Sequence, residues 1–315
     1  MRVLITGGAG FIGTNLAYAL LSGGDAIGII DDLSAGKREN LHPYAWTRVL
    51  DILDPTFPAL VAQFEPDAVV HLAAQASVAE SQRDPDRDWA VNAEGTRIVA
   101  QAALAAGAKR VISASSAAVY GEPVEADLPL AENATKAPVN PYGRSKLAAE
   151  GLLADTLSGT GVDWASFRFS NVYGPRQDGA GEGGVVAVFC QRIHEGTTPV
   201  VYGDGSQTRD FIYVGDVVGA IVSALDAEAT LAPGVGDAAA YNVSTGLETS
   251  VNELFGALRI ASGFLGDVEY GAAREGDVLR SSLDATKAAK TFGWKAHQTL
   301  ELGAEMTWRW YESQA

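Results

Sequence analysis

Three evenly spaced glycines near the amino terminus constrain the fold more than any other feature of the sequence. Gly7, Gly10 and Gly13 follow one another at intervals of three residues. They lie between the aliphatic run Val3–Thr6 and the helix-like segment Thr14–Leu21. Glycine permits a tight turn from a strand into a helix, and it lets backbone N–H groups approach a pyrophosphate. Because a helix amino terminus adds partial positive charge there, the spacing predicts a unit that binds dinucleotide phosphates.

Short aliphatic runs alternate with helix-like stretches through the first half of the chain. Nearly continuous apolar runs are typical of parallel strands that are buried on both faces. The alternation therefore predicts an α/β fold, a Rossmann-type doubly wound parallel sheet with a smaller, interleaved C-terminal substrate domain. The expected strands are Val3–Thr6, Ala26–Ile30, Ala68–Leu72, Arg110–Ser113 and Asp163–Phe169, and the expected helices are Thr14–Leu21, Asn92–Ala106 and Tyr142–Thr156.

The alternation breaks after Asn171, where the stretch Gln177–Gly184 is rich in glycine and charge. We expect residues 1–170 to form the dinucleotide-binding domain and residues 171–315 the substrate-facing domain. Strands near Val214 and Asn242 are expected to return to the first sheet, so residues of about 210–245 interleave with the first domain. The last segment, Leu300–Tyr311, has the spacing of a helix.

The charge balance limits the partners of the chain. Lys and Arg number 23 against 39 Asp and Glu, a net charge of −16. An acidic surface repels polyanions, so we expect no nucleic-acid and no membrane partner. One cysteine, Cys190, excludes an internal disulfide, and the four histidines lack ligand spacing, so no metal site is expected. With no apolar run of about 20 residues and no leader before Val3, we expect a soluble cytoplasmic protein.

Two carboxylates mark the end of the second predicted strand. Asp31 and Asp32 follow Gly13 closely, at the distance that a ribose-binding residue has from the glycine turn. A carboxylate at this position accepts hydrogen bonds from the adenosine ribose hydroxyls and repels a 2′-phosphate. NAD is therefore the predicted cofactor, while Lys37 and Arg38 nearby keep NADP open as an alternative.

A tyrosine and a lysine lie four residues apart on another predicted helix. Tyr142 and Lys146 share one face of that helix, Asn140 is its expected N-cap and Pro141 its first residue. A phenol with a pKa of about 10 is a weak base at neutral pH, and a neighbouring ammonium and the positive nicotinamide ring both favour the phenolate. The segment 113–116 ends the fourth predicted strand, where α/β sheets bind ligands, and its serines can hold a substrate oxygen.

Together these motifs resemble the extended short-chain dehydrogenase/reductase family, and within it the nucleotide-sugar epimerases of the UDP-glucose 4-epimerase type. The resemblance extends over essentially the whole chain. The motifs that carry it are Thr6–Gly13, Asp31–Leu41, His71–Ala74, Ser115–Gly121, Tyr142–Lys146, Asn171–Arg176, Gly203–Tyr213 and Arg274–Asp277.

The resemblance implies a role for each matching residue. Ser116, Tyr142 and Lys146 match the catalytic hydroxyl, the catalytic base and its lysine partner. The residues that it places against NAD are Gly7, Gly10, Phe11, Ile12, Gly13, Asp31, Asp32, Lys37, Asp51, Ile52, Leu72, Ala73, Ala74, Tyr142 and Lys146. Those that it places against a UDP-sugar are Ser116, Asn171, Val185, Val186, Arg209, Arg274, Asp277 and Ser281.

The reaction that the resemblance implies is 4-epimerisation of a UDP-hexose. Tyr142 removes the proton of the sugar 4-hydroxyl while hydride passes from C4 to NAD, and hydride then returns to the opposite face. Related dehydratases carry Asp-Glu where this chain has Ala117 and Ala118, and alanine cannot transfer a proton. An NAD(P)H-dependent keto-sugar reductase and a non-catalytic, nucleotide-sensing regulator remain the alternatives.

The substrate range and the assembly follow from the same resemblance. Ser281 stands where relatives restricted to glucose and galactose carry tyrosine, so we expect UDP-GlcNAc and UDP-GalNAc beside UDP-glucose and UDP-galactose. Asp178 stands where uronic-acid epimerases carry arginine, and its charge argues against a uronic acid. The helices predicted at Asn92–Ala106 and Tyr142–Thr156 form the dimer contact in this family, so we expect a homodimer.

Overall fold

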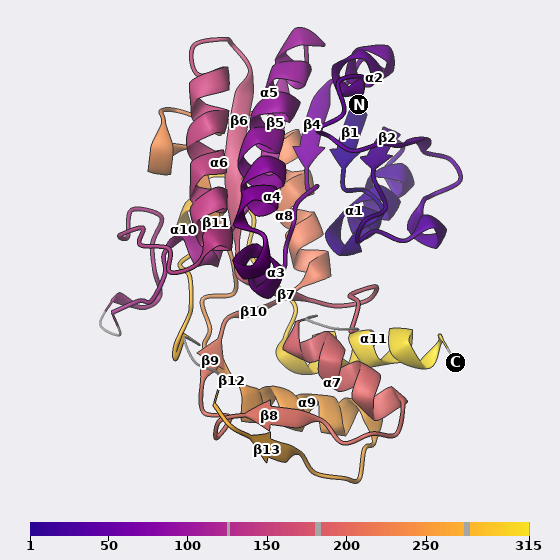
Figure 1. Cartoon of the computed structure of the whole chain (residues 1–315), viewed down its shortest axis with the longest axis vertical. Helices are drawn as coiled ribbons and strands as arrows, with labels where there is room; N and C mark the ends of the chain where they lie inside the picture. The colour runs from indigo at the N-terminus through magenta and orange to yellow at the C-terminus, as the bar shows by residue number, and fades with distance from the viewer. Residues whose placement is uncertain (125–126, 180–183, 274–277, 315) are drawn as a thin grey trace.

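The computed structural model describes residues 1–124, 127–179, 184–273 and 278–314. Within these ranges, seven parallel strands form one sheet in the order β3-β2-β1-β4-β5-β6-β11 (Figure 1). This confirms the predicted Rossmann-type sheet, in which the strand order reverses between β1 and β4. The strands are β1 (Arg2–Thr6), β2 (Ala26–Asp31), β3 (Trp46–Val49), β4 (Ala68–His71), β5 (Arg110–Ser116), β6 (Asp163–Phe169) and β11 (Ala240–Val243).

Helices cover both faces of this sheet because successive strand residues point to opposite sides. On one face, Leu16 and Val217 share a hydrophobic core with Val3 and Ile5. On the other face, Val61 and Leu153 share a second core with Leu4. The first face carries α1 (Phe11–Ser22), α8 (Val214–Asp226) and α10 (Thr286–Phe292); the second carries α2 (Phe57–Phe64), α5 (Gly95–Ala105) and α6 (Pro141–Leu157).

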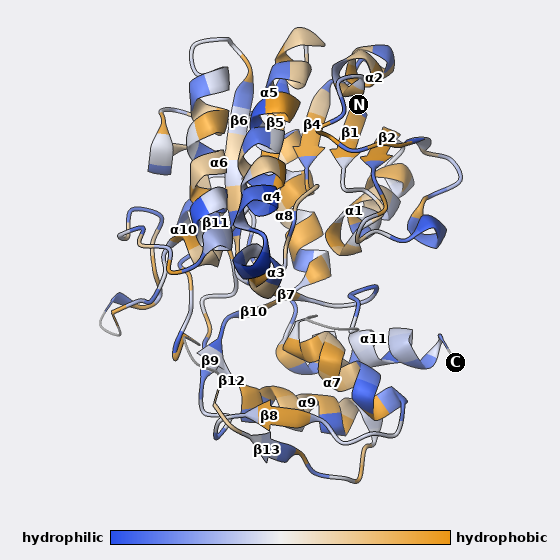
Figure 2. Cartoon of the chain, viewed as in Figure 1, coloured by the Kyte–Doolittle hydropathy of each residue, from blue (hydrophilic) through white to orange (hydrophobic). Residues whose placement is uncertain are grey.

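A separate core lies beyond the carboxyl ends of the strands, in the lower part of Figure 1. Figure 2 shows apolar residues concentrated in β1, β2 and β4 of the large sheet and in α7 and β8 of this lower part. Its elements are α7 (Val185–His194), β8 (Val200–Tyr202), β12 (Thr249–Ser250), α9 (Val251–Ser262), β13 (Glu269–Gly271) and α11 (Leu300–Glu312). Its strands pair only two at a time, β8 with β13 and β12 with β9 (Thr208–Arg209), within the described residues.

Short elements line the boundary between the two parts. They are α3 (Val78–Arg83), α4 (Pro85–Trp89), β7 (Asn171–Tyr173), β10 (Phe211–Tyr213), the π-helical turn η2 (Ala90–Glu94) and the 3-10 turns η1 (Arg38–Asn40) and η3 (Ala117–Val119). The 3-10 turn η5 (Gly236–Ala238) instead precedes β11 and contacts α6. The carboxyl ends of β1, β2 and β4 point toward this boundary (Figure 1). None of the described helices has the length and apolar character needed to cross a membrane.

The structure tests the two strands predicted to return to the large sheet, and it contains one strand that was not predicted. The strand near Asn242 is confirmed, because β11 pairs with β6. A strand near Val214 is also present, β10, which ends at Tyr213 just before α8 begins. Its predicted return to the large sheet is wrong, because β10 pairs with β7 in a sheet of its own. β11 already occupies the edge beside β6, so no place remains there for a second returning strand. The edge strand β3 was not predicted, because its half-exposed residues lack a continuous apolar run.

Candidate active site

The glycine turn between β1 and α1 admits no side chain at two of its positions. Gly7 has φ +72°, and a Cβ on it would lie 2.6 Å from Ala73 N at the end of β4. A Cβ on Gly13 would lie 2.2 Å from Gly7 O. The first turn of α1 therefore lies directly against this backbone, at the point where the strand order reverses. A cradle of bare backbone at a helix amino terminus fits the pyrophosphate of a dinucleotide.

Asp31 ends β2 beside this turn and is 6% exposed. Its Oδ2 accepts a hydrogen bond from Ala9 N at 2.9 Å, and its Oδ1 accepts one from Leu33 N at 2.8 Å. Burial raises the pKa of this carboxyl, and the two backbone N–H groups oppose that shift. Each oxygen keeps a lone pair that can accept a ribose hydroxyl. The two backbone N–H groups thus fix the orientation of this carboxylate beside the glycine turn.

The remaining residues predicted against the cofactor lie around the same edge of the sheet. Phe11 and Ile12 form the first turn of α1, and Leu72, Ala73 and Ala74 directly follow β4. Leu72 N donates to Thr6 O at 3.0 Å, which holds the end of β4 against β1.

Three further predicted residues lie on loops at the edge of the sheet. Asp32 is engaged by Ser34 N and Oγ in a turn of its own. Asp51 accepts from Leu53 N at 2.9 Å. The side chain of Ile52 is 4% exposed and packs in the core beneath α5.

The three predicted catalytic residues come from β5 and α6. Ser116 is the last residue of β5, and its Oγ accepts from Ala118 N at 3.2 Å. The predicted N-cap is confirmed, since the Asn140 side chain accepts from Gly143 N and α6 begins at Pro141. Lys146 is 6% exposed; its Nζ donates to Ala114 O at 3.0 Å and lies 6.0 Å from the centre of the Tyr142 ring.

Burial dominates the electrostatics of this group. It raises the pKa of Tyr142, while the hydrogen bond with Ser116 opposes the shift and the charge of Asp88 adds to it. Burial lowers the pKa of Lys146 to about 8, against the charges of Asp88 and Glu150. Lys146 Nζ is directed at Ala114 O. The lowering of the pKa of Tyr142 by Lys146 together with the nicotinamide concerns the complex with the cofactor, and it stays a prediction.

A buried polar cluster that the sequence did not predict lies against the first turn of α6. Asp88 Oδ1 accepts from Gln75 Nε2 at 2.9 Å and from Asn92 Nδ2 at 3.0 Å. Asn92 Nδ2 also lies 3.2 Å from Ser145 Oγ, which donates to Tyr142 O at 3.0 Å. The four-residue spacing of Asp88 and Asn92 was the one available signal, and it is common in any helix.

His71 is buried behind the glycine turn. It ends β4, is 3% exposed, and its Nδ1 lies 2.7 Å from Thr6 Oγ1. Its Nε2 lies 3.1 Å from Thr96 Oγ1. Burial lowers the pKa of His71 to about 3, with a smaller contribution from the charge of Lys146, so the ring is neutral at physiological pH. It links β1, β4 and α5 behind the glycine turn.

Some of the residues predicted to bind the substrate lie at the boundary between the two parts, and others lie in the lower part. Asn171 is exposed at the start of β7, and Arg209 on β9 is half-buried, with its NH1 donating to Thr208 O at 2.8 Å. Ser281 is half-buried. Val185 and Val186 begin α7, where Val186 is 2% exposed in the lower core. Arg274 and Asp277 lie outside the described residues.

Asp210 connects the segments around Arg209. It is fully buried, and its Oδ1 accepts from Thr245 N at 2.9 Å and from Thr245 Oγ1 at 2.7 Å. Its Oδ2 accepts from Gly246 N at 3.0 Å and Leu283 N at 3.2 Å. One carboxylate thus fixes the loop after β11 and the segment that carries Ser281.

Asp178 lies beside the loop after β2. Its carboxylate is 3.6 Å from Lys37 Nζ, and both side chains are about half-exposed. The argument that its charge disfavours a uronic acid stays a prediction.

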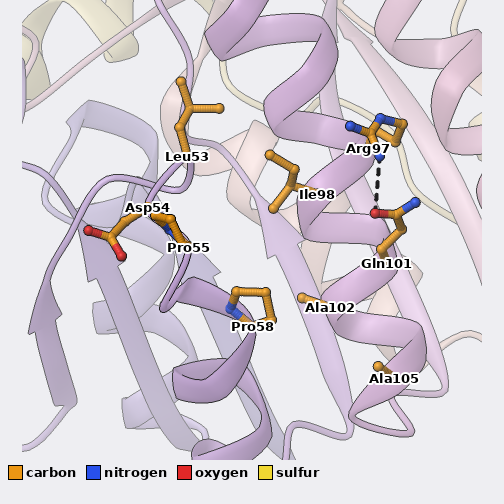
Figure 3. A pocket seen from close by; sticks show the side chains of 9 residues that line it. All are labelled: Leu53, Asp54, Pro55, Pro58, Arg97, Ile98, Gln101, Ala102 and Ala105. Carbon is orange, nitrogen blue, oxygen red and sulfur yellow. Dashed lines mark hydrogen bonds between the residues drawn. The ribbon is translucent and has the colours of Figure 1, made fainter.

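A surface hollow of about 420 Å³ lies between α5 and the segment that leads into α2 (Figure 3). Arg97 and Gln101 project into it from α5 and are hydrogen-bonded to each other. Leu53 and Pro58 face them from the segment around α2. None of the residues predicted for catalysis lines this hollow.

Comparison with known proteins assigns the family. The model of the NAD dependent epimerase/dehydratase family matches residues 3–243. The chain belongs to this family. It is 39% identical over 322 residues to the UDP-glucose 4-epimerase of Mycolicibacterium smegmatis, with 100% of both chains covered.

Two solved structures extend the comparison. The Thermus thermophilus UDP-glucose 4-epimerase in complex with NAD superposes with a TM-score of 0.90 at 36% identity, covering 100% of both chains. The UDP-N-acetylglucosamine 4-epimerase of Methanobrevibacter ruminantium, in complex with UDP-N-acetylmuramic acid, gives 0.91 at 33% identity, covering 100% of this chain and 99% of that one. The predictions of an epimerase-class enzyme that uses NAD are thereby confirmed.

Proposed function

We propose that this protein epimerises UDP-hexoses at C4 by transient oxidation, with UDP-glucose and UDP-galactose as substrates. The observation that carries the proposal is the grouping of Ser116, Tyr142 and Lys146 at the carboxyl end of β5, beside the glycine cradle. Ala117 and Ala118 follow Ser116 in η3, so this turn supplies no acid for the elimination of water.

Each residue of the group has one task in the proposed reaction. Ser116 holds the sugar 4-oxygen against the phenol, and Tyr142 takes the proton of the 4-hydroxyl as its base. Lys146 supplies positive charge that favours the phenolate once it turns from Ala114 O toward the ribose of the cofactor. Bound NAD supplies the nicotinamide that accepts hydride from C4 and returns it. Tyr142 gives its proton back to the 4-oxygen after the sugar has turned over.

A second part of the proposal is that 2-acetamido sugars are also substrates. Ser281 is small and half-buried, and it lies two residues from Leu283, whose N–H is bound by Asp210. A small side chain there leaves space for the acetamido group at C2. The Methanobrevibacter ruminantium relative, named for UDP-N-acetylglucosamine, supports this range.

Incubation of the purified protein with UDP-galactose, with no nicotinamide added, tests the reaction by proton NMR. We expect conversion to UDP-glucose, because NAD is held throughout a cycle without net redox change. If conversion required added NADH or NADPH and oxidised that nucleotide stoichiometrically, the protein would instead be a keto-sugar reductase.

Tyr142→Phe should lower kcat by about 10²- to 10⁴-fold. If Tyr142→Phe kept the full biological activity of the parent, catalysis would not be the function, and the nucleotide-sensing regulator would be favoured.

Ser281→Tyr tests the substrate range. The variant should lose activity on UDP-GalNAc while it retains activity on UDP-galactose, because the phenol fills the space of the acetamido group. Ser281→Ala is the control, since it changes the polarity and leaves the space. Equal losses on both sugars in Ser281→Tyr would contradict the argument from size.

The proposal extends to organisation and assembly. Residues 1–170, with the returning segment of about 210–245, bind NAD, and residues 171–315 bind the sugar nucleotide, including Asn171, Arg209, Arg274 and Asp277. Two copies associate through α5 and α6 into a homodimer. Light scattering of the purified protein should give twice the mass of the chain, and a monomer would refute the dimer.

A further inference from the structure

Asp88 is a buried carboxylate that the proposed reaction leaves without a task. It lies on the short helix α4 and is 1% exposed. Gln75 and Asn92 both donate to its Oδ1, whereas its Oδ2 has no hydrogen-bond partner within the described part of the chain. Burying a charge costs free energy unless other groups compensate it. A buried carboxylate with hydrogen bonds to only one of its two oxygens therefore calls for an explanation.

The position of Asp88 links it to the catalytic helix by hydrogen bonds. Asn92, which donates to Asp88, also lies beside Ser145 Oγ, and Ser145 donates to the carbonyl of Tyr142. Asn92 belongs to the π-helical turn η2, an uncommon geometry that is frequent at functional sites. Ser81 on α3 contributes a further contact, because its Oγ accepts from Tyr142 N at 3.2 Å. The first turn of α6 is thus anchored on both sides.

The charge of Asp88 acts on both members of the catalytic pair. It raises the pKa of Lys146 against the larger effect of burial, and it adds to the raised pKa of Tyr142. Because Asp88 and Lys146 are both buried, solvent screens the interaction between their charges only weakly. Asp88 therefore opposes the loss of charge that burial would impose on Lys146.

The other charged groups around α6 are compensated or exposed. Glu150, one turn after Lys146, is paired with the buried Arg168 at 2.6 Å. His71 is neutral, because burial lowers its pKa to about 3. The ion pairs Arg83–Glu80 on α3 and Arg97–Glu94 beside α5 are exposed to solvent, as is Asp86 on α4. Asp237 beside η5 pairs with Lys136 and Arg168.

We propose that Asp88 is the positioning residue of the Tyr142–Lys146 pair: it anchors the first turn of α6 through Asn92, and its charge keeps Lys146 protonated. The inference rests on the proposed function, in which Tyr142 is the base. It assigns to a residue outside the catalytic group the task of setting the pH range in which that group works.

Asp88→Asn tests the charge with little change of shape, because the amide oxygen can still accept from Gln75 and Asn92. Loss of the negative charge lowers the pKa of both Lys146 and Tyr142. Both limbs of the pH profile of kcat/KM should therefore move to lower pH, by about one unit. Asp86→Asn, which removes the same charge from an exposed position of the same helix, should leave both limbs in place.

Asp88→Glu is the conservative variant. It keeps the charge, so its limbs should stay at the pH of the parent even where altered packing lowers kcat. A shift in Asp88→Glu equal to that of Asp88→Asn would overturn the proposal, and so would unshifted limbs in Asp88→Asn. Because these two variants make opposite predictions, a failure of Asp88→Asn to fold leaves Asp88→Glu as a test.

A readout without turnover separates this inference from the proposed function. The ultraviolet absorbance of tyrosinate, measured against pH as the difference between the protein and its Tyr142→Phe variant, reports the ionisation of Tyr142 alone. That titration should move to lower pH in the Asp88→Asn background even if the protein does not epimerise UDP-galactose. An unchanged titration would overturn the electrostatic role of Asp88 whatever the substrate.

Discussion

Two buried carboxylates show how differently the two parts of the molecule are held. Asp31 binds Ala9 N and Leu33 N, so it fixes the glycine turn and the loop directly after its own strand. Asp210 binds Thr245, Gly246 and Leu283, segments that are 35 to 73 residues away in the sequence. Burial raises the pKa of both carboxyls. The same device thus orders a local turn in one part and a set of distant loops in the other.

The cores of the two parts differ in the same way. In the large sheet, continuous apolar strands such as β1 and β4 are buried on both faces. In the lower part, short strands contribute little, and Phe189 and Leu254 pack between helices instead. The large sheet is consequently organised by backbone pairing, and the lower part by contacts among side chains from distant segments.

Gly13→Ala should have the largest effect, and it should break the part that backbone packing holds. The added Cβ would lie 2.2 Å from Gly7 O and 2.7 Å from Gly8 Cα, so the turn must open. We expect a loss of at least about 3 kcal/mol in the free energy of unfolding, and NAD lost on purification. Denaturant unfolding and the NAD released per chain measure the two effects. Normal stability and NAD content would show that the turn is not closely packed.

Asp210→Asn and Asp31→Asn compare the two carboxylates directly. In either variant, the amide NH₂ faces backbone N–H groups that it cannot accept from. Asp210→Asn should cost about 2 kcal/mol of unfolding free energy and raise KM for the sugar nucleotide. Asp31→Asn should cost less stability and lose NAD instead, because fewer segments depend on it. If both variants lost NAD equally, the proposal that Asp31 supports NAD binding and Asp210 supports sugar-nucleotide binding would be wrong.

His71→Gln tests how the free energy of unfolding depends on pH through a buried group of the large sheet. Buried His71 has its pKa lowered to about 3, whereas the unfolded chain takes up the proton near 6.5. As pH falls through that interval, only the unfolded state binds the proton, so the parent should lose about 1.4 kcal/mol per pH unit from this group. Glutamine retains hydrogen-bonding groups and should flatten that slope.

Urea unfolding at neutral pH and at a mildly acidic pH within the interval measures the effect. His297→Gln, at an exposed position, is the control and should keep the slope of the parent. Equal slopes in His71→Gln and the parent would show that His71 does not become protonated on unfolding.

Gly151→Ala should have the smallest effect, and in the opposite direction to Gly13→Ala. A Cβ on Gly151, within α6, would meet nothing within 4 Å. Alanine should therefore stabilise the helix by about 0.5–1 kcal/mol. A thermal melt of each alanine variant compares the two glycines. Destabilisation by Gly151→Ala would show that the space beside Gly151 is not open in solution.

The accuracy of prediction from the sequence follows the same division. The strands from Val3 to Phe169 and the cap at Asn140 were predictable, because their signals are apolar runs and local turns. The half-exposed strand β3 and the helix that begins at Val214 were not, because their formation depends on which edges of the sheet remain free. Ser116, Tyr142 and Lys146 were predicted as catalytic from a motif. The burial of Asp88 was not predicted, since a carboxylate on a short polar helix resembles a solvated residue.

What the sequence alone determined is the set of features with short range: the glycine turn, the parallel strands, the Tyr142–Lys146 spacing and the family that these motifs indicate. Only the tertiary structure decided where Asp88, Asp210 and Asp178 lie. The reason is physical. A strand or a helix turn depends on neighbours within a few residues, whereas the burial and the partners of a charge depend on segments brought together by the whole fold.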